Sequence, residues 1–92
     1  MEELIANYRV IIEKETYKDG APVYVSTVPT LGISDYGDTI DEAFKNIELA
    51  IRFHLECLVE ENKAIPYPDQ ANQFFITNTK VEFLPKRKFS FA

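Results

Sequence analysis

The acidic side chains, one histidine and one cysteine are the residues of this 92-residue chain that could do chemistry. A metal-dependent nuclease needs several carboxylates that converge on two divalent cations. Glu13 and Glu15 share one side of a predicted strand, whereas Glu48 and Glu56 lie on the outer arc of a predicted helix. These positions do not converge, so we interpret them as a solvated charged surface. The pattern predicts no catalytic residue, no metal site and no cofactor.

His54 and Cys57 could in principle form a base and a nucleophile. His54 falls within an apolar helical stripe, and no serine or cysteine is placed to use it as a base, so we interpret it as a hydrogen-bonded core residue. We interpret Cys57 as a small packing residue. A single cysteine excludes an internal disulfide framework and, with a single histidine, a structural zinc site built from Cys and His within one chain. We expect a non-enzymatic protein of a reducing compartment, the cytoplasm, with no membrane span or signal peptide.

Residues 37–63 are predicted to form the long helix on which the rest of the chain is organised. Thr39 and Glu42 form a T-x-x-E capping box, which places the start of the helix near Thr39. No helix-breaking residue follows until Pro66. A wide apolar stripe, expected to cover a sheet, consists of Ile40, Ala43, Phe44, Ile47, Ala50, Ile51, His54, Leu55 and Leu58.

A second, narrower apolar row runs along the outer side of the same helix. It consists of Leu49, Phe53 and Cys57, spaced at i, i+4 and i+8 and flanked by charged residues. An apolar row on a charged face lowers solubility unless something covers it. We therefore predict that this row is an interface in a homodimer or higher oligomer, or with another partner.

Short segments rich in β-branched and aromatic residues surround the helix. Residues 8–17 and 22–29 are predicted to form an antiparallel hairpin, because an Asp-Gly pair lies between them. Residues 33–36 form a predicted third strand, and residues 73–84 a fourth. The expected fold is α+β in the order β-β-β-α-β: a three-stranded antiparallel meander covered by one long helix, plus a C-terminal strand. We expect residues 1–92 to be a single domain with a core of about residues 8–84.

Residues 85–92 form a basic, aromatic tail. Residues 1–79 carry 6 basic and 14 acidic side chains, a net charge of −8, whereas residues 80–92 carry 4 basic and 1 acidic, a net charge of +3. The acidic body argues against a general nucleic-acid binder and suits a basic partner. Disordered segments are poor in aromatic residues, so we predict that Phe89 and Phe91 dock on the chain's own sheet, a second copy or a partner. A frayed terminus is the alternative.

The stretches VYVSTVPTLG, GDTIDEA, KNIELAIRFHLECLVEEN and PYP together resemble the HicB antitoxin family. The resemblance covers about residues 8–69, and the GDT-x-DEA element after a P-x-L-G turn is its most specific part. It implies a partial RNase H-like domain with the order β-β-β-α-β, the same order that the residues predict. Many relatives carry a cysteine after the turn glycine, where this chain has Ile33, which we interpret as a core residue.

The resemblance also implies a partner and a function. A HicB-like antitoxin would neutralise a HicA-type mRNA-cleaving toxin by occlusion, with an acidic surface covering a basic one. The alternative is an orphan oligomeric HicB-like module with a regulatory or ligand-binding role and no toxin; a residual RNase H-like nuclease is the weaker enzymatic option. Relatives that repress their own operon continue into a DNA-binding segment, but only 23 residues follow Asp69. We therefore expect a short form that lacks this domain and does not bind specific DNA by itself.

Overall fold

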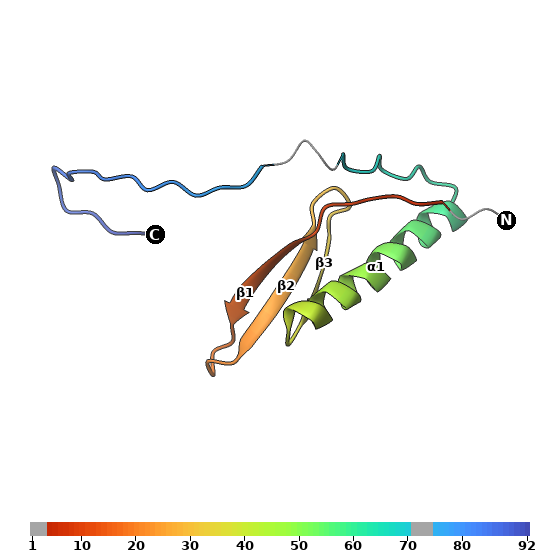
Figure 1. The fold of residues 1–92 in the computed structure, drawn as a ribbon, viewed down its shortest axis with the longest axis horizontal. Coiled ribbons are helices and arrows are strands. Elements are labelled where there is room, and N and C mark those ends of the chain that lie inside the picture. Colours follow the sequence, from red (N-terminus) through yellow and green to blue (C-terminus); the bar gives the residue numbers. More distant parts are fainter. Residues whose placement is uncertain (1–3, 71–74) are drawn as a thin grey trace.

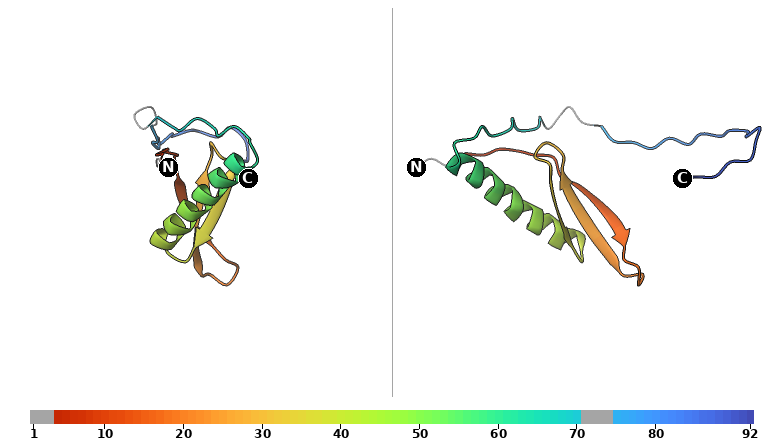
Figure 2. Two further views of the ribbon diagram at one scale, coloured as in Figure 1. Left: turned by 90° about the vertical axis from the view of Figure 1, so that its right-hand side faces the viewer. Right: turned by 180° about the vertical axis from the view of Figure 1, so that it is seen from behind.

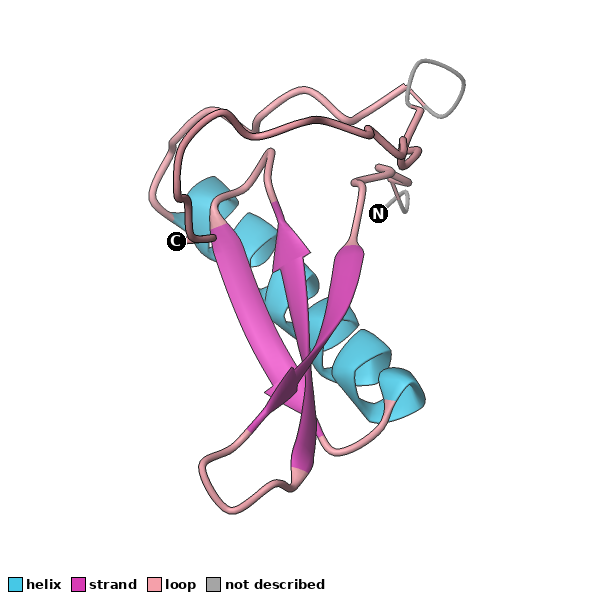
Figure 3. Ribbon diagram, turned by 90° about the vertical axis from the view of Figure 1, so that its left-hand side faces the viewer, coloured by secondary structure: helices cyan, strands magenta, loops and turns pink. Residues whose placement is uncertain are grey.

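The computed structural model describes residues 4–70 and 75–92 of the chain. Three strands, β1 (Ile11–Thr16), β2 (Pro22–Val28) and β3 (Ile33–Gly37), are followed by one helix, α1 (Ile40–Glu60). The strands form an antiparallel sheet in the order β1-β2-β3, and α1 lies across one face of it (Figures 1 and 3). The predicted α+β arrangement of a meander and a long helix is confirmed.

Two turns built on glycine set the register of the meander. In the β1–β2 hairpin, Gly20 has a φ of +89°, and Asp19 Oδ1 accepts a hydrogen bond from the Ala21 amide at 2.9 Å. Between β2 and β3, Gly32 has a φ of +67° and donates its amide to the Val28 carbonyl at 2.9 Å. Positive φ values are accessible to glycine at little cost, so the D-G and L-G pairs place these turns.

Thr39 caps α1 as the sequence predicts. Its hydroxyl accepts a hydrogen bond from the Glu42 amide at 3.0 Å, and Asp41 and Glu42 place negative charge in the first turn. Just before the cap, Gly37 lets the helix approach β3 very closely: a β-carbon at Gly37 would lie 2.5 Å from the Ala43 nitrogen. The G-D-T-x-D-E-A motif therefore specifies how strand and helix join.

A small core lies between α1 and the sheet. Val28, Ala43 and Ile47 are completely buried, and the buried Ser26 hydroxyl lies 3.1 Å from the Asp35 and Ala43 carbonyl oxygens. A hydroxyl has one proton to donate, so it serves these two acceptors alternately. This contact joins the middle strand to the first turns of the helix. On the opposite face of the sheet, Val23 is also buried.

The sheet covers less of the helix than the apolar stripe predicts. Ile40 and Phe44 were expected to be covered but are 58% and 44% exposed; Ala50, Ile51, His54, Leu55 and Leu58 are half-buried. The reason is that α1 packs chiefly against β3 and β2 and only marginally against β1. Three short strands are too narrow a layer for a stripe of this width. Ile33, predicted to lie in the core, is also half-buried.

The predicted fourth strand is not formed in the part that the structure describes. Residues 75–92 contain no strand and run as an extended chain that leaves the sheet (Figures 1 and 2); residues 73 and 74 lie outside the described residues. A strand forms only when its main chain pairs with the edge of another strand, and the described part of this segment pairs with none. The Cα radius of gyration is consequently 18.3 Å, compared with about 12 Å for a compact chain of this length.

No helix among the described residues is both long enough and apolar enough to cross a membrane.

Candidate protein-binding surfaces

The outer row of α1 is largely exposed. Leu49 and Phe53 are 62% and 70% exposed, and Cys57 is half-buried. Glu48, Arg52 and Glu56 are exposed around them. A leucine and a phenylalanine one helical turn apart form a continuous apolar ridge, which has the composition of a protein-binding surface with a charged border.

The tail forms a second apolar group, separate from that ridge. The ring centroids of Phe83 and Phe89 lie 5.5 Å apart and those of Phe89 and Phe91 lie 5.7 Å apart, both edge to face. These contacts hold the end of the chain in a bend (Figure 1), yet Phe89 and Phe91 remain 56% and 89% exposed. The tail extends away from α1 in Figure 1 and in the right-hand view of Figure 2. The two predicted interface groups are therefore not brought together within one chain.

The residues considered for chemistry are spread over the molecule. Glu13 and Glu15 are exposed on β1, Glu48 and Glu56 are exposed on α1, and His54 is half-buried on α1. Within residues 4–70 and 75–92, no three His, Cys, Asp or Glu side chains lie close enough together to hold a metal ion.

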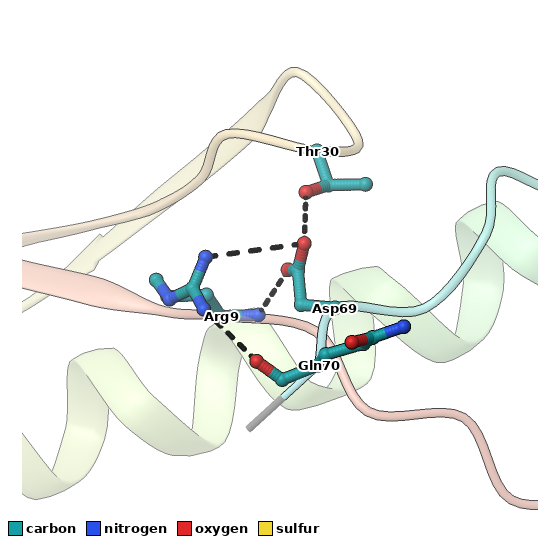
Figure 4. Close-up of polar contacts among 4 residues, drawn as sticks. All are labelled: Arg9, Thr30, Asp69 and Gln70. Carbon is teal, nitrogen blue, oxygen red and sulfur yellow. Dashed lines mark hydrogen bonds and ion pairs between the residues drawn. The ribbon is translucent and has the colours of Figure 1, made fainter. Parts of the chain in front are cut away.

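Asp69 forms a polar junction that no pattern in the sequence predicts. Its carboxylate oxygens accept hydrogen bonds from the Arg9 amide at 2.7 Å and from the Thr30 hydroxyl at 2.6 Å (Figure 4). The Asp69 amide donates to the Asn7 carbonyl at 2.8 Å, and the Arg9 guanidinium lies 4.0 Å from the carboxylate. These bonds tie the segment after the helix to the start of β1 and to the β2–β3 turn.

The junction shifts the pKa values of two side chains. The hydrogen bond from the Arg9 amide, followed by the Thr30 hydroxyl and the Arg9 charge, holds the pKa of Asp69 below its ordinary value of 3.8. Burial, and then the negative charge of Asp69, raises the pKa of Tyr8. The Tyr8 hydroxyl donates to the Pro66 carbonyl at 2.6 Å. The local sequence Pro-Tyr-Pro-Asp predicts only an extended exit from the helix, since nothing in it indicates partners near residue 8.

The opposite face of the sheet carries a shallow, open hollow. It is lined by Glu15, Tyr17, Val23, Val25, Ser34, Asp35 and Tyr36. Tyr17 and Tyr36 are 49% and 61% exposed, so no described segment forms a second layer over this face. Within residues 4–70 and 75–92, the sheet is therefore covered on one side only.

Comparisons with known proteins place the chain among bacterial antitoxins. Residues 8–83 match the family described as the HicB-like antitoxin of bacterial toxin–antitoxin systems. A UPF0150 protein from Synechocystis sp. is 41% identical over 66 residues, which are 71% of this chain and 78% of that protein. A 14.9 kDa protein encoded in the rep–hol intergenic region of Haemophilus phage HP1 is 37% identical over 67 residues. These are 73% of this chain but only 47% of the phage protein. No solved structure matches the chain.

Proposed function

Because the chain belongs to the HicB-like antitoxin family, we propose that it binds a HicA-type mRNA-cleaving toxin and neutralises it by covering its RNA-binding surface. The protein acts as a binding module in the cytoplasm and performs no catalysis of its own. Inhibition by occlusion requires only a folded surface that competes with RNA for the toxin. It requires no reacting side chains.

The observation that carries this proposal is the outer side of α1, where an exposed apolar ridge lies within a charged border in which Glu48 and Glu56 outnumber Arg52. Leu49 and Phe53 form the ridge, and Glu48 and Glu56 are exposed beside them, where they can meet a basic partner. An RNA-cleaving protein needs a basic surface to hold phosphates, and an acidic surface complements it. Such complementarity increases the association rate and favours the correct partner. The net charge of −8 over residues 1–79 acts in the same direction.

Self-association forms part of the same proposal. The described chain has only four buried hydrophobic residues, Val23, Val28, Ala43 and Ile47, and it exposes apolar side chains on α1, on the open sheet face and in the tail. A second copy packed on the Leu49, Phe53 and Cys57 row would cover part of this surface. The toxin then meets the charged border around that contact.

Specific DNA binding by this chain alone is not part of the proposal. Reading base edges requires a helix or ribbon in the major groove, and the exposed outer side of α1 is acidic. Lys86, Arg87 and Lys88 offer at most three phosphate contacts, which weaken quickly as salt is added. A gel shift with the gene's own upstream DNA at about physiological salt should show no specific retardation.

The direct test begins with the reading frame next to this chain's gene, which should encode a small basic protein, and uses that protein as the binding partner. Calorimetry should show binding that weakens when the ionic strength rises from about 0.05 M to about 0.5 M, and the complex should no longer cleave mRNA. Replacing Glu48 and Glu56 with lysine should weaken binding by about tenfold or more. Glu15→Lys, on the hollow face of the sheet, is the matched control and should have little effect.

Two outcomes would contradict the proposal. If the folded protein does not bind the neighbouring protein, the orphan module without a toxin becomes the better description. If it binds but the toxin still cleaves mRNA, occlusion is the wrong mechanism.

A further inference from the structure

The two edge strands of the sheet, β1 and β3, differ in how many of their outward main-chain N–H and C=O groups lack a hydrogen-bond partner among the described residues. In the β1–β2 hairpin the Tyr17 amide donates to the Ala21 carbonyl at 2.8 Å. Main-chain bonds in an antiparallel pair alternate by residue, so the odd-numbered residues of β1 bond to β2. The register then directs the main-chain groups of Ile12, Lys14 and Thr16 toward the outer edge. The part of the chain that the structure describes provides no partner for them.

The edge of β3, in contrast, is protected at Tyr36. The same alternation, carried across β2, directs the main-chain groups of Ser34 and Tyr36 outward. The Tyr36 amide donates to Asp35 Oδ1 at 2.8 Å, and the Tyr36 carbonyl accepts from Asn46 Nδ2 at 2.8 Å. Side chains that occupy edge groups in this way prevent another strand from pairing. Of the two edges, β1 is therefore the one open to an added strand.

The helix is also uncovered on the side toward β1. Asn46 reaches over the outer edge of β3, and Phe44 lies nearly opposite Asn46 around the helix at 100° per residue. Phe44, Ile51 and Leu55 therefore face along the sheet in the direction of β1. Phe44 is 44% exposed, and Ile51 and Leu55 are half-buried. A fourth strand beside β1 would lie under these three side chains.

The chain itself carries a segment that fits this position. Residues 77–83 are extended and unpaired, with Val81 and Phe83 exposed by 72% and 57%. Thr79, Val81 and Phe83 share one side of an extended chain, and Lys80 and Glu82 share the other. With the first side facing α1, Lys80 lies on the same face as Glu13 and Glu15 of β1. The net charge of +3 over residues 80–92 also suits the acidic body.

We propose that residues 77–83 of one chain pair with the open edge of β1 in a second copy, so that two chains exchange their C-terminal segments. The described tail extends away from its own sheet (Figures 1 and 2), and the molecule is 64 Å long as a result. When the exchange is reciprocal, the β1 edge of each chain gains a partner strand. The exposed Phe44, Ile51 and Leu55 side of each helix is then covered as well.

Disulfide trapping between differently labelled chains tests this contact. In a Cys57→Ser background, a chain with Lys14→Cys on β1 is mixed with an isotope-labelled chain carrying Thr79→Cys or Val81→Cys. Mild oxidation should give a linked heterodimer, identified by mass. Tyr36→Cys, at the protected position of the β3 edge, replaces Lys14→Cys as the control and should give none.

A chain carrying both cysteines separates exchange from folding back. If it yields mainly an internally linked monomer while the mixture yields no heterodimer, the segment pairs with its own β1 and the proposal is wrong. If neither sample forms a link, the segment does not pair with β1, and the proposal is equally wrong.

A proline substitution gives a second, independent measurement. Val81→Pro removes a main-chain donor from the segment, and the dissociation constant for self-association should rise by about tenfold or more. Circular dichroism from α1 and the three-stranded sheet should not change, because residue 81 lies outside these elements. Lys88→Pro, beyond the pairing segment, is the matched control. Unchanged association of Val81→Pro would overturn the proposal, and this result does not depend on whether a toxin binds.

Discussion

The Arg9 amide donates to a carboxylate oxygen of Asp69 at 2.7 Å across 60 positions of sequence. The same carboxylate accepts from Thr30 in the β2–β3 turn, so one side chain joins three segments at one end of the sheet (Figure 4). The segment that leaves the helix is therefore held beside the start of β1.

The Asp69 junction should make stability depend on pH in the acid range. Because the folded-state pKa of Asp69 lies below its ordinary value of 3.8, its stabilising contribution is present above that value and is lost as the pH falls through the folded-state pKa. Asp69→Asn should therefore be less stable than the natural protein at about pH 6, with a difference that shrinks toward about pH 2. Urea unfolding at several pH values measures this difference. Glu15→Gln, an exposed carboxylate without a hydrogen-bond partner in the described residues, should show no such trend.

Gly37→Ala should destabilise the fold by roughly 1–3 kcal/mol, because the added methyl group forces strand and helix apart. The new carbon would lie 2.5 Å from the Ala43 nitrogen and 2.9 Å from the Glu42 carbonyl carbon, both main-chain atoms that cannot rotate away. Chemical denaturation gives the change in the free energy of unfolding. Ser34→Ala, exposed in the same strand, is the control and should change it by less than about 0.5 kcal/mol. Equal stability of the two variants would contradict the close approach.

Thr39→Ala should lower stability by about 1 kcal/mol through loss of the helix cap. The hydroxyl accepts the Glu42 amide at 3.0 Å, and alanine cannot replace that acceptor. Thr39→Ser keeps the hydroxyl and should recover most of the loss. If serine and alanine destabilise equally, the effect comes from packing rather than from capping.

Phe53→Glu should reduce the mass of the protein measured by sedimentation, because a charge in the centre of the Leu49, Phe53 and Cys57 row opposes burial. Val59→Glu makes the same type of change at a side chain that is 59% exposed and lies on a different side of α1. It should leave the mass unchanged. An unchanged mass for Phe53→Glu would show that this row is not a self-association surface.

Structured RNA and an RNA–DNA hybrid should both remain intact when incubated with the protein in Mg²⁺ or Mn²⁺. The physical reason is that no three acidic, histidine or cysteine side chains among the described residues lie close enough together to hold a metal ion, whereas two-metal cleavage requires several carboxylates to converge. Cleavage that disappears on replacing Glu13 or Glu48 would contradict this prediction and indicate a nuclease.

Local patterns in the sequence determined the elements and their order. Thr39 and Glu42 mark the start of α1 because a cap is formed by residues three apart, and Gly20 and Gly32 mark the turns because few other residues adopt positive φ values. The outer row of Leu49 and Phe53 was also predictable, since helical periodicity alone separates it from the buried stripe.

Only the tertiary structure decided how far these elements cover one another. The apolar stripe gives the width of a helix face but not the number of strands beneath it, so Ile40 and Phe44 were expected to be buried and are exposed. Residues 75–84 have strand-forming composition, yet pairing depends on a partner edge that local sequence does not specify. The Asp69 junction joins residues 60 positions apart, and no local pattern encodes such a contact. These features arise from long-range packing, which depends on where the whole chain places each surface.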